Sequence, residues 1–397
     1  MNKIRTGLVA ILAIAGSMVA TVGYADDGIT VGFATAQSGF MVPFDQGGQQ
    51  AAIMAMEQIN AAGGIGGRKF KWVTSDTKSD LVEGAKAGLD VVRQGADLVV
   101  VTCDYDYGAP AALAAQNANK ISFFLCAEDA KAGIQGVGPD SFSASIAAPV
   151  QGATIAEWAI KKKGWKTAYV LLDDKWEYNK SVCAGFDWAF PKFGGKIIGR
   201  DVFKNDDVSI APQVTRLRGL STPPDLVMLC SSIPGGASAL RQIRSAGIDT
   251  PIASGMAMDG TYWTDAVPNL SNFYIPAQGA IYGNDPDPKI NQFVEDYAKR
   301  WGQQPPSAYV FPGWVMIEVY AQAVKQAGTT DTDRVVAELE KLKGYPTRFG
   351  PRSFTSSLHI QDAARYEIMD FESGKPAPLG YWTLSEPVPM DVLFRKQ

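Results

Sequence analysis

The chain has 397 residues, of which 46% are hydrophobic and 20% charged, and its formal net charge is −4 at pH 7. This composition suits a globular protein, the length favours two domains, and the mild acidity argues against a nucleic-acid partner. The only histidine, His359, leaves little basis for a multi-histidine metal site or a histidine-based catalytic triad. We therefore expect no metal and no cofactor.

The N-terminus predicts an export signal that is cleaved after Ala25. Lys3 and Arg5 supply the positive start, and an apolar run follows over 8–20. The run is too short to be a stable membrane span, and a buried N-terminal helix is the alternative interpretation. The residue after the predicted cut is Asp26 and not a cysteine, so we expect no lipid anchor.

After the signal, predicted strands alternate with predicted helices. The predicted strands are 29–34, 70–74, 98–102, 121–125, 167–172, 196–203, 226–230 and one that begins at 251–253. The predicted helices are 47–60, 81–94, 109–118, 152–162, 180–190, 237–246, 286–301, 312–327 and 333–343. Regular alternation indicates a doubly wound, mostly parallel sheet, and the pattern restarts near residue 150, which predicts a second lobe of the same kind. We expect irregular strands and turns in the last fifty or so residues.

A glycine-rich segment follows the first predicted helix, with Gly63, Gly64, Gly66 and Gly67 close together. A nucleotide-binding loop would follow a strand and open a helix, whereas these glycines follow a helix and precede a strand. The order favours a helix stop and a turn over a phosphate site.

The four cysteines favour disulfides, because the count is even and the chain is predicted to be exported. Cys103 and Cys126 end consecutive strands that a doubly wound order would place side by side, within reach of a bridge. That would leave Cys183 and Cys230 to pair in the second lobe. Four buried free thiols are the alternative.

Several segments resemble the leucine/isoleucine/valine-binding protein family, the type I periplasmic receptors of ABC importers. They are 31–33 leading to Ser38-Gly39, then 59–67, 75–80, 91–101 and 240–248. The resemblance covers almost the whole chain after the signal, and the helix followed by Gly-Gly-x-x-Gly is its most specific part.

The resemblance implies two doubly wound α/β lobes joined by three crossings, near residues 148–150, 276–280 and 350. Lobe one would comprise 28–147 and 280–350, and lobe two 148–279 and 351–397, after a signal peptide of 1–25. The ligand would lie in the cleft between the lobes.

Ligands of open parallel sheets lie beyond the carboxyl ends of the strands, where free helix amides also favour anions. Four strand ends are candidates here, together with aromatic positions that match the family's cleft. The expected ligand-contacting residues are Phe44, Asp104, Tyr105, Cys126, Ala127, Glu128, Trp176, Tyr178, Ser231, Ser232, Met256, Asp259 and Tyr282. Ordinary packing for the aromatic residues, and helix capping or solvation for the acidic ones, are the alternatives.

Two positions depart from the family's pattern. Asp104, Tyr105 and Asp106 replace a hydroxyl-rich segment that holds the ligand's carboxylate, and Met256 stands where the family has an acid for the ammonium group. Asp259 or Asp104 could take that ammonium instead. A branched-chain amino acid, another carboxylate, an amide or a different polar solute all remain open as ligands.

The resemblance therefore implies a monomeric periplasmic receptor, not an enzyme, that closes on a small solute and delivers it to an ABC permease of the inner membrane. A sensor of the same fold is the first alternative. An exported α/β hydrolase is the second, although the chain has no Gly-x-Ser-x-Gly elbow.

Overall fold

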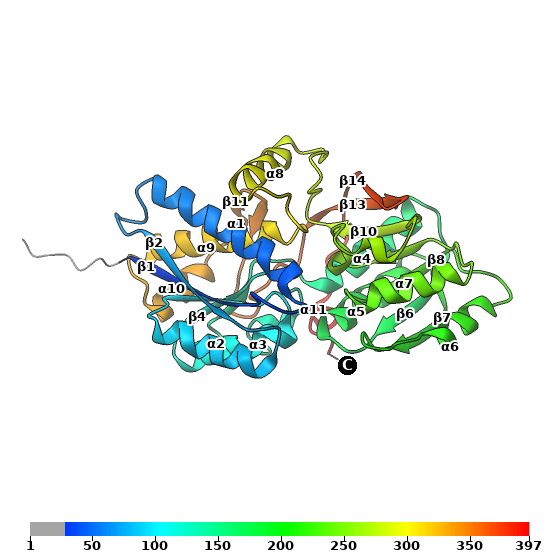
Figure 1. The fold of residues 1–397 in the computed structure, drawn as a ribbon, viewed down its shortest axis with the longest axis horizontal. Coiled ribbons are helices and arrows are strands. Elements are labelled where there is room, and N and C mark those ends of the chain that lie inside the picture. The colour runs from blue at the N-terminus through cyan, green and yellow to red at the C-terminus, as the bar shows by residue number, and fades with distance from the viewer. Residues whose placement is uncertain (1–27, 397) are drawn as a thin grey trace, which may run out of the picture.

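The computed structural model describes residues 28–396, so the predicted signal peptide lies outside the described residues. Two α/β lobes lie side by side and meet in the middle of the molecule (Figure 1). This arrangement confirms the predicted fold class. No helix within 28–396 is long and apolar enough to cross a bilayer.

Lobe one contains a five-stranded parallel sheet in the order β2-β1-β3-β4-β5. Its strands are β1 (Ile29–Thr35), β2 (Phe70–Asp76), β3 (Leu98–Val101), β4 (Ile121–Phe124) and β5 (Ser141–Ser143). Helices α2 and α3 pack together on one face, and α1 and α9 pack together on the other (Figure 1). The lobe's helices are α1 (Val42–Ala61), α2 (Leu81–Arg93), α3 (Tyr105–Asn117), α8 (Pro288–Trp301), α9 (Val310–Ala327) and α10 (Thr332–Leu339), with a short hairpin of β11 (Tyr345–Thr347) and β12 (Gly350–Arg352).

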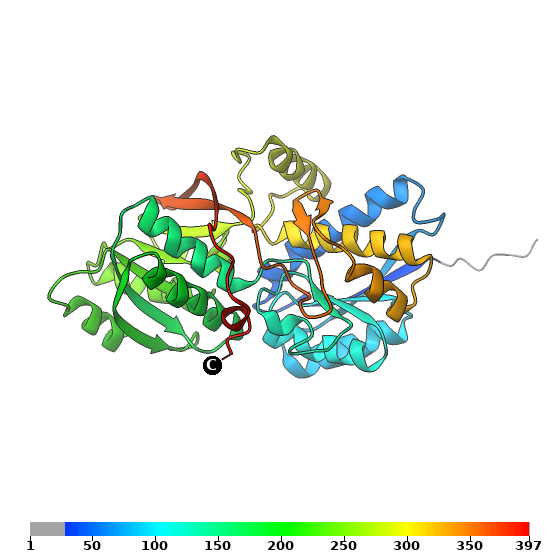
Figure 2. The same ribbon diagram turned by 180° about the vertical axis from the view of Figure 1, so that it is seen from behind.

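Lobe two contains a seven-stranded sheet in the order β14-β13-β10-β9-β8-β6-β7. Its strands are β6 (Thr167–Asp173), β7 (Lys196–Phe203), β8 (Leu226–Cys230), β9 (Ile252–Ser254), β10 (Phe273–Ala277), β13 (Arg365–Glu372) and β14 (Lys375–Thr383). Its α-helices are α4 (Ala148–Lys161), α5 (Glu177–Lys192), α6 (Ala211–Arg218), α7 (Gly235–Ser245) and α11 (Met390–Leu393). Helix α7 is in front in Figure 1, whereas α4 and α5 are in front in Figure 2, so helices cover both faces of this sheet.

Local sequence explains most of these elements. All four residues of β3 are apolar and buried, as expected for a central parallel strand that is covered on both faces. The side chain of Asp80 accepts hydrogen bonds from the first turn of α2 and caps that helix. All four glycines of 63–67 have positive φ, so this segment ends α1 and turns into β2, as predicted.

Several helices begin earlier in the chain than we expected, and three of these starts lie at the pocket. Helix α1 starts at Val42, α3 at Tyr105 and α5 at Glu177. Their first turns carry polar and aromatic residues that face the other lobe, so they lack the apolar period by which a helix is read from sequence. The correction matters because it places Tyr105 in the first turn of α3 and Trp176 at the N-cap of α5.

The chain crosses between the lobes three times, and the crossings are hydrogen-bonded to one another. The amide of Gln361 donates to Ser145 O at 3.1 Å, and the amide of Ala147 donates to Gln361 O at 2.8 Å. Gln278, in the second crossing, donates to Ser145 Oγ at 3.0 Å. The three segments therefore form one connected hinge.

Residues after the predicted third crossing near residue 350 still contact lobe one. Phe354 and His359 both pack against Phe142 of lobe one, and the His359 ring lies 3.8 Å from that of Phe142. His359 also hydrogen-bonds to Ser141 O at 2.9 Å. These contacts hold residues 353–361 on lobe one.

The C-terminal region is more regular than we expected. Strands β13 and β14 form an antiparallel hairpin that extends the lobe-two sheet beyond β10. The chain then runs back along lobe two and ends with α11 at the junction of the lobes (Figure 2). Helix α11 packs against α4 and α5.

Candidate functional site

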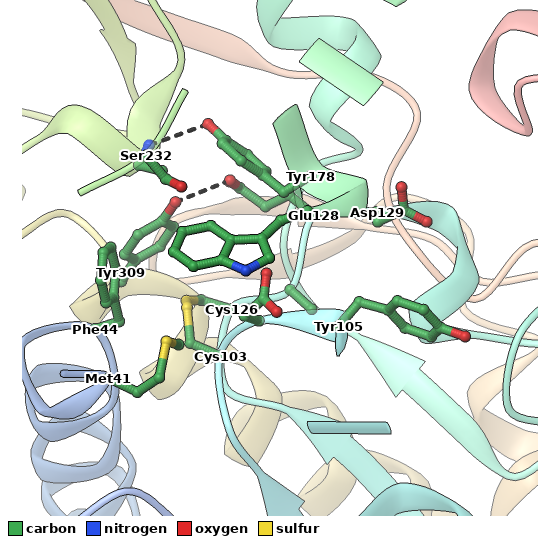
Figure 3. A pocket seen from close by; sticks show the side chains of 14 residues that line it. Met41, Phe44, Cys103, Tyr105, Cys126, Glu128, Asp129, Tyr178, Ser232 and Tyr309 are labelled. Atoms are coloured by element: carbon green, nitrogen blue, oxygen red, sulfur yellow. Dashed lines mark hydrogen bonds between the residues drawn. A yellow bond between two sulfur atoms is a disulfide. The ribbon is translucent and has the colours of Figure 1, made fainter. Parts of the chain in front are cut away.

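A small pocket lies between the two lobes, with a cavity volume of about 30 Å³ (Figure 3). It lies beyond the carboxyl ends of β3 and β4 in lobe one and of β6, β8 and β9 in lobe two, as the fold predicts. The lobe-one wall consists of Met41, Phe44, Cys103, Asp104, Tyr105, Cys126, Ala127, Glu128, Asp129 and Tyr309. The lobe-two wall consists of Trp176, Tyr178, Ser232 and Ala257.

Most of the predicted ligand-contacting residues line this pocket. They are Phe44, Asp104, Tyr105, Cys126, Ala127, Glu128, Trp176, Tyr178 and Ser232. Whether they touch ligand stays a prediction, but the fold brings them to one cavity.

Four predicted residues do not line the pocket, because other groups hold them outside its wall. Ser231 Oγ donates to Asp173 at 2.8 Å. Met256 is fully buried. Asp259 accepts hydrogen bonds from the Tyr282 hydroxyl at 3.2 Å and from an amide of lobe one at 2.7 Å. Asp259 and Tyr282 therefore support the junction of the lobes.

Sequence reasoning missed Met41, Asp129, Ala257 and Tyr309 as pocket residues, and it assigned Cys103 only to a disulfide. Tyr309 precedes α9, in the part of the chain that follows the second crossing, so its place beside Glu128 depends on a contact between segments far apart in the sequence. Asp129 had a detectable signal, since it directly follows Glu128 at a candidate strand end.

Glu128 lies at the back of the pocket, next to the hinge. It accepts hydrogen bonds from Tyr309 at 3.1 Å and from Ser145 at 3.2 Å (Figure 3). Burial raises the pKa of Glu128 to about 8 in spite of these bonds.

Asp104 is both a pocket residue and a helix cap. Its side chain accepts a hydrogen bond from the amide of Tyr107 at 3.2 Å, which caps α3. Burial, with a further contribution from the nearby Asp106 carboxyl, raises the pKa of Asp104 to about 8.

Tyr178 fixes part of the lobe-two wall through two hydrogen bonds. The Tyr178 hydroxyl donates to Gln151 at 2.9 Å and accepts a hydrogen bond from the amide of Ala257 at 3.0 Å. Ser232 Oγ, which also lines the pocket, has no hydrogen-bond partner among the described residues.

Residues 28–374 match the family of periplasmic binding proteins. The chain belongs to this family. The family consists of solute-binding proteins, which confirms the resemblance and agrees with a receptor rather than an enzyme.

The curated and solved relatives span nearly the whole binding protein. This chain is 25% identical to Leu/Ile/Val-binding protein homolog 3 of Brucella melitensis, over 94% of this chain and 99% of that protein. The substrate-binding protein LivJ of Streptococcus pneumoniae, solved with isoleucine, superposes with a TM-score of 0.77 at 22% identity, over 90% of this chain and 99% of that one. A solute-binding protein of Rhodopseudomonas palustris, solved with 3,4-dihydroxybenzoic acid, has a TM-score of 0.73 at 19% identity, over 91% and 99% of the chains.

A network of charged groups connects the lobes of the binding protein beside the pocket. Asp106 of lobe one accepts the amide of Glu177 at 2.9 Å and so caps α5 from the opposite lobe. Lys131 of lobe one pairs with Glu177 at 2.7 Å. Arg395, after α11, pairs with Asp129 at 3.1 Å and also with Glu177.

Glu177 is the centre of this network. Burial opposes its ionisation, but ion pairs with Lys131, Arg395 and Lys180 lower its pKa to about 2. Glu177 is therefore charged throughout the physiological range. We refer to Asp106, Asp129, Lys131, Glu177 and Arg395 as the rim network.

The binding protein contains both expected disulfides. Cys103–Cys126 joins the ends of β3 and β4, with Cα atoms 4.5 Å apart, and lines the pocket. Cys183–Cys230 joins α5 to β8, with Cα atoms 5.6 Å apart. Each lobe therefore carries one covalent link behind its wall of the pocket.

Proposed function

We propose that this protein is the periplasmic receptor of an ABC importer, and that it works as a monomer after removal of residues 1–25. It closes its lobes around a small solute, and a permease of the inner membrane recognises the closed form. The lobes correspond to the two sheets, with boundaries at the three hinge crossings. The residues that line the pocket hold the solute.

The main support is that both lobes contribute walls to one pocket. A ligand that touches Glu128 on one side and Tyr178 on the other binds the closed form better than the open form. Hinge closure is driven by such differential affinity. The relatives solved with isoleucine and with 3,4-dihydroxybenzoic acid support a small solute as the ligand.

The position of the only histidine argues against a hydrolase. His359 is fully buried, stacks on Phe142 and hydrogen-bonds to Ser141 O. It does not line the pocket, so it could not activate Ser232 there.

A thermal-shift screen of the protein without its signal tests this proposal. The panel contains branched-chain and other amino acids, aromatic carboxylates, dicarboxylates, amides, amines and urea. A true ligand at 100 times its Kd adds about 2.7 kcal/mol of stability, which raises Tm by several degrees. Small-angle scattering should show a smaller radius of gyration with the same ligand. Turnover of an ester or amide without any such stabilisation would contradict the proposal.

A further inference from the structure

The pocket wall is acidic and has no basic residue. Asp104, Glu128 and Asp129 line it, and the residues on its two walls include no lysine, arginine or histidine. Carboxyl groups that ionise in a cavity of low dielectric constant attract a cation and disfavour an anion.

The cations nearest to the pocket are already committed to the rim network. Arg395 pairs with Asp129 and Glu177, and Lys131 pairs with Glu177. Within residues 28–396, neither Asp104 nor Glu128 forms an ion pair. Two carboxyl groups of the pocket therefore lack a counter-charge from the protein.

Three backbone amides close to the pocket are occupied by side chains. Asp104 accepts a hydrogen bond from the amide of Tyr107 in the first turn of α3. Asp106 accepts one from the amide of Glu177 in the first turn of α5. In lobe two, the Tyr178 hydroxyl takes the amide of Ala257 at 3.0 Å. Helix N-termini that would attract an anion are thus neutralised by the protein's own oxygens.

The rest of the wall suits a compact organic cation. Aromatic rings from both lobes surround the cavity, and their faces attract cations. These rings belong to Phe44, Tyr105, Trp176, Tyr178 and Tyr309. Ser232 is only 4% exposed, and its unpartnered hydroxyl is available to accept an N–H from the ligand (Figure 3).

From this geometry we infer that the receptor's ligand is a small alkylammonium cation without a free carboxylate, balanced by Asp104 and Glu128 and enclosed by the aromatic rings. This inference rests on the proposed receptor function and narrows its substrate class.

The ionisation of the two carboxyl groups should make ligand binding depend on pH. Asp104 faces Asp106 and Asp129, and Glu128 faces the hydroxyls of Tyr178, Tyr309 and Tyr366. Because burial raises both carboxyl pKa values to about 8, binding of a cation at neutral pH must release protons. Affinity for the cation should therefore increase from about pH 6 to about pH 9. An anion held by the protonated acids would show the opposite trend.

Matched probes test the substrate class, each set being an amino acid, the amine that lacks its carboxyl group and the acid that lacks its amino group. The sets are alanine, ethylamine and propionate; valine, isobutylamine and isovalerate; and leucine, isopentylamine and isocaproate. Calorimetry on the protein without its signal should find an amine that binds at least about tenfold more tightly than its amino acid and its acid, which is about 1.4 kcal/mol. The same titration in two buffers of different ionisation enthalpy should show proton release.

Tighter binding of an amino acid or an acid than of its amine would overturn this inference and leave the receptor proposal standing. If no probe of any class bound or closed the lobes, the inference would fail as well, and the receptor proposal would lose its support. The two failures are therefore distinguishable.

Variants separate the two pocket carboxyls from general charge effects. Asp104→Asn and Glu128→Gln should each weaken amine binding about tenfold or more and abolish part of the proton release. Asp90→Asn makes the same change from carboxyl to amide on α2, away from the pocket, and should leave binding unchanged. Equal amine affinity in the wild type and in both pocket variants, with circular dichroism showing all proteins folded, would also overturn the inference.

Discussion

Two sets of carboxyl groups lie close together at the cleft and have opposite surroundings. Asp129 and Glu177 of the rim network are paired with Arg395, and Glu177 also pairs with Lys131. Asp104 and Glu128, in the pocket, receive hydrogen bonds from uncharged groups only. The first set contributes to closing the lobes, whereas the second is available to a ligand.

The comparison shows that residues of the same type can have different roles at one cleft. A buried carboxylate with a cation stays ionised and holds two lobes together, while a buried carboxyl without one keeps its proton. The pKa of Glu177 is lowered to about 2 and that of Glu128 is raised to about 8, although the two residues lie at the same cleft.

The largest effect is expected from Glu128→Gln on stability. The raised pKa means that the native state binds more protons than the unfolded state from about pH 4.5 to about pH 8, so wild-type stability falls as pH rises through this window. The variant cannot ionise at this position, so it escapes that loss. The difference in free energy of unfolding, variant minus wild type, should therefore increase by on the order of 4 kcal/mol between about pH 4 and about pH 9. Urea unfolding at both pH values measures this. An unchanged difference would mean that Glu128 is not penalised by burial.

A smaller effect is expected from Asp129→Ala in the rim network. The change leaves Arg395 without one partner and removes the hydrogen bond from Ser181 at 2.6 Å. Loss of a buried pair should weaken every ligand about 100-fold, or about 2.7 kcal/mol, without changing the order of preference among ligands. Calorimetry with two ligands of different charge checks this. A selective loss would show that Asp129, which also lines the pocket, acts on the ligand directly and not only through the rim network.

Arg395→Ala should weaken binding about tenfold, mainly through faster dissociation, because its ion pair with Asp129 bridges the two lobes. Stopped-flow fluorescence of Trp176, which lies at the cleft and stacks on Phe40 of lobe one, should report the release rate. Lys396→Ala is the matched control. It removes a neighbouring positive charge whose ammonium group lies over the Phe394 ring and is not part of the rim network. Equal release rates in both variants would exclude Arg395 from closure.

The smallest effect is expected from Lys131→Gln. The Lys131 side chain is 43% exposed, so its ion pair with Glu177 is screened by solvent. We expect at most a threefold or so loss of affinity, which should disappear at about 1 M salt. A loss as large as that of Arg395→Ala would show that the pair is shielded from solvent when the lobes close.

Much of the fold could be predicted because apolar runs and turn residues are local signals. The strands 196–203 and 226–230 match their predicted bounds, and the glycines of 63–67 turn the chain as expected. The helix starts at Val42, Tyr105 and Glu177 could not be predicted in the same way. Their first turns face the other lobe, so their burial depends on tertiary contacts.

The candidate site was predicted where a strand end lies directly on the pocket, and missed where the orientation of one side chain decides. Ser232 lines the pocket, whereas Ser231 turns to Asp173, because consecutive residues point in different directions. Asp259 is drawn to an amide of lobe one, and Tyr309 arrives from a distant segment. Neither contact can be recognised from the neighbouring residues in the sequence.

The sequence by itself determined two α/β lobes and the strand ends that surround the pocket, since these follow from periodicity and strand order, and the family was indicated by the resemblance of particular segments. Only the tertiary structure decided which carboxyl groups are charged. Arg395 reaches Asp129 and Glu177 from the far end of the chain, and it leaves Asp104 and Glu128 without a cation. Charge state depends on distances across the closed cleft, and those distances are a property of the fold.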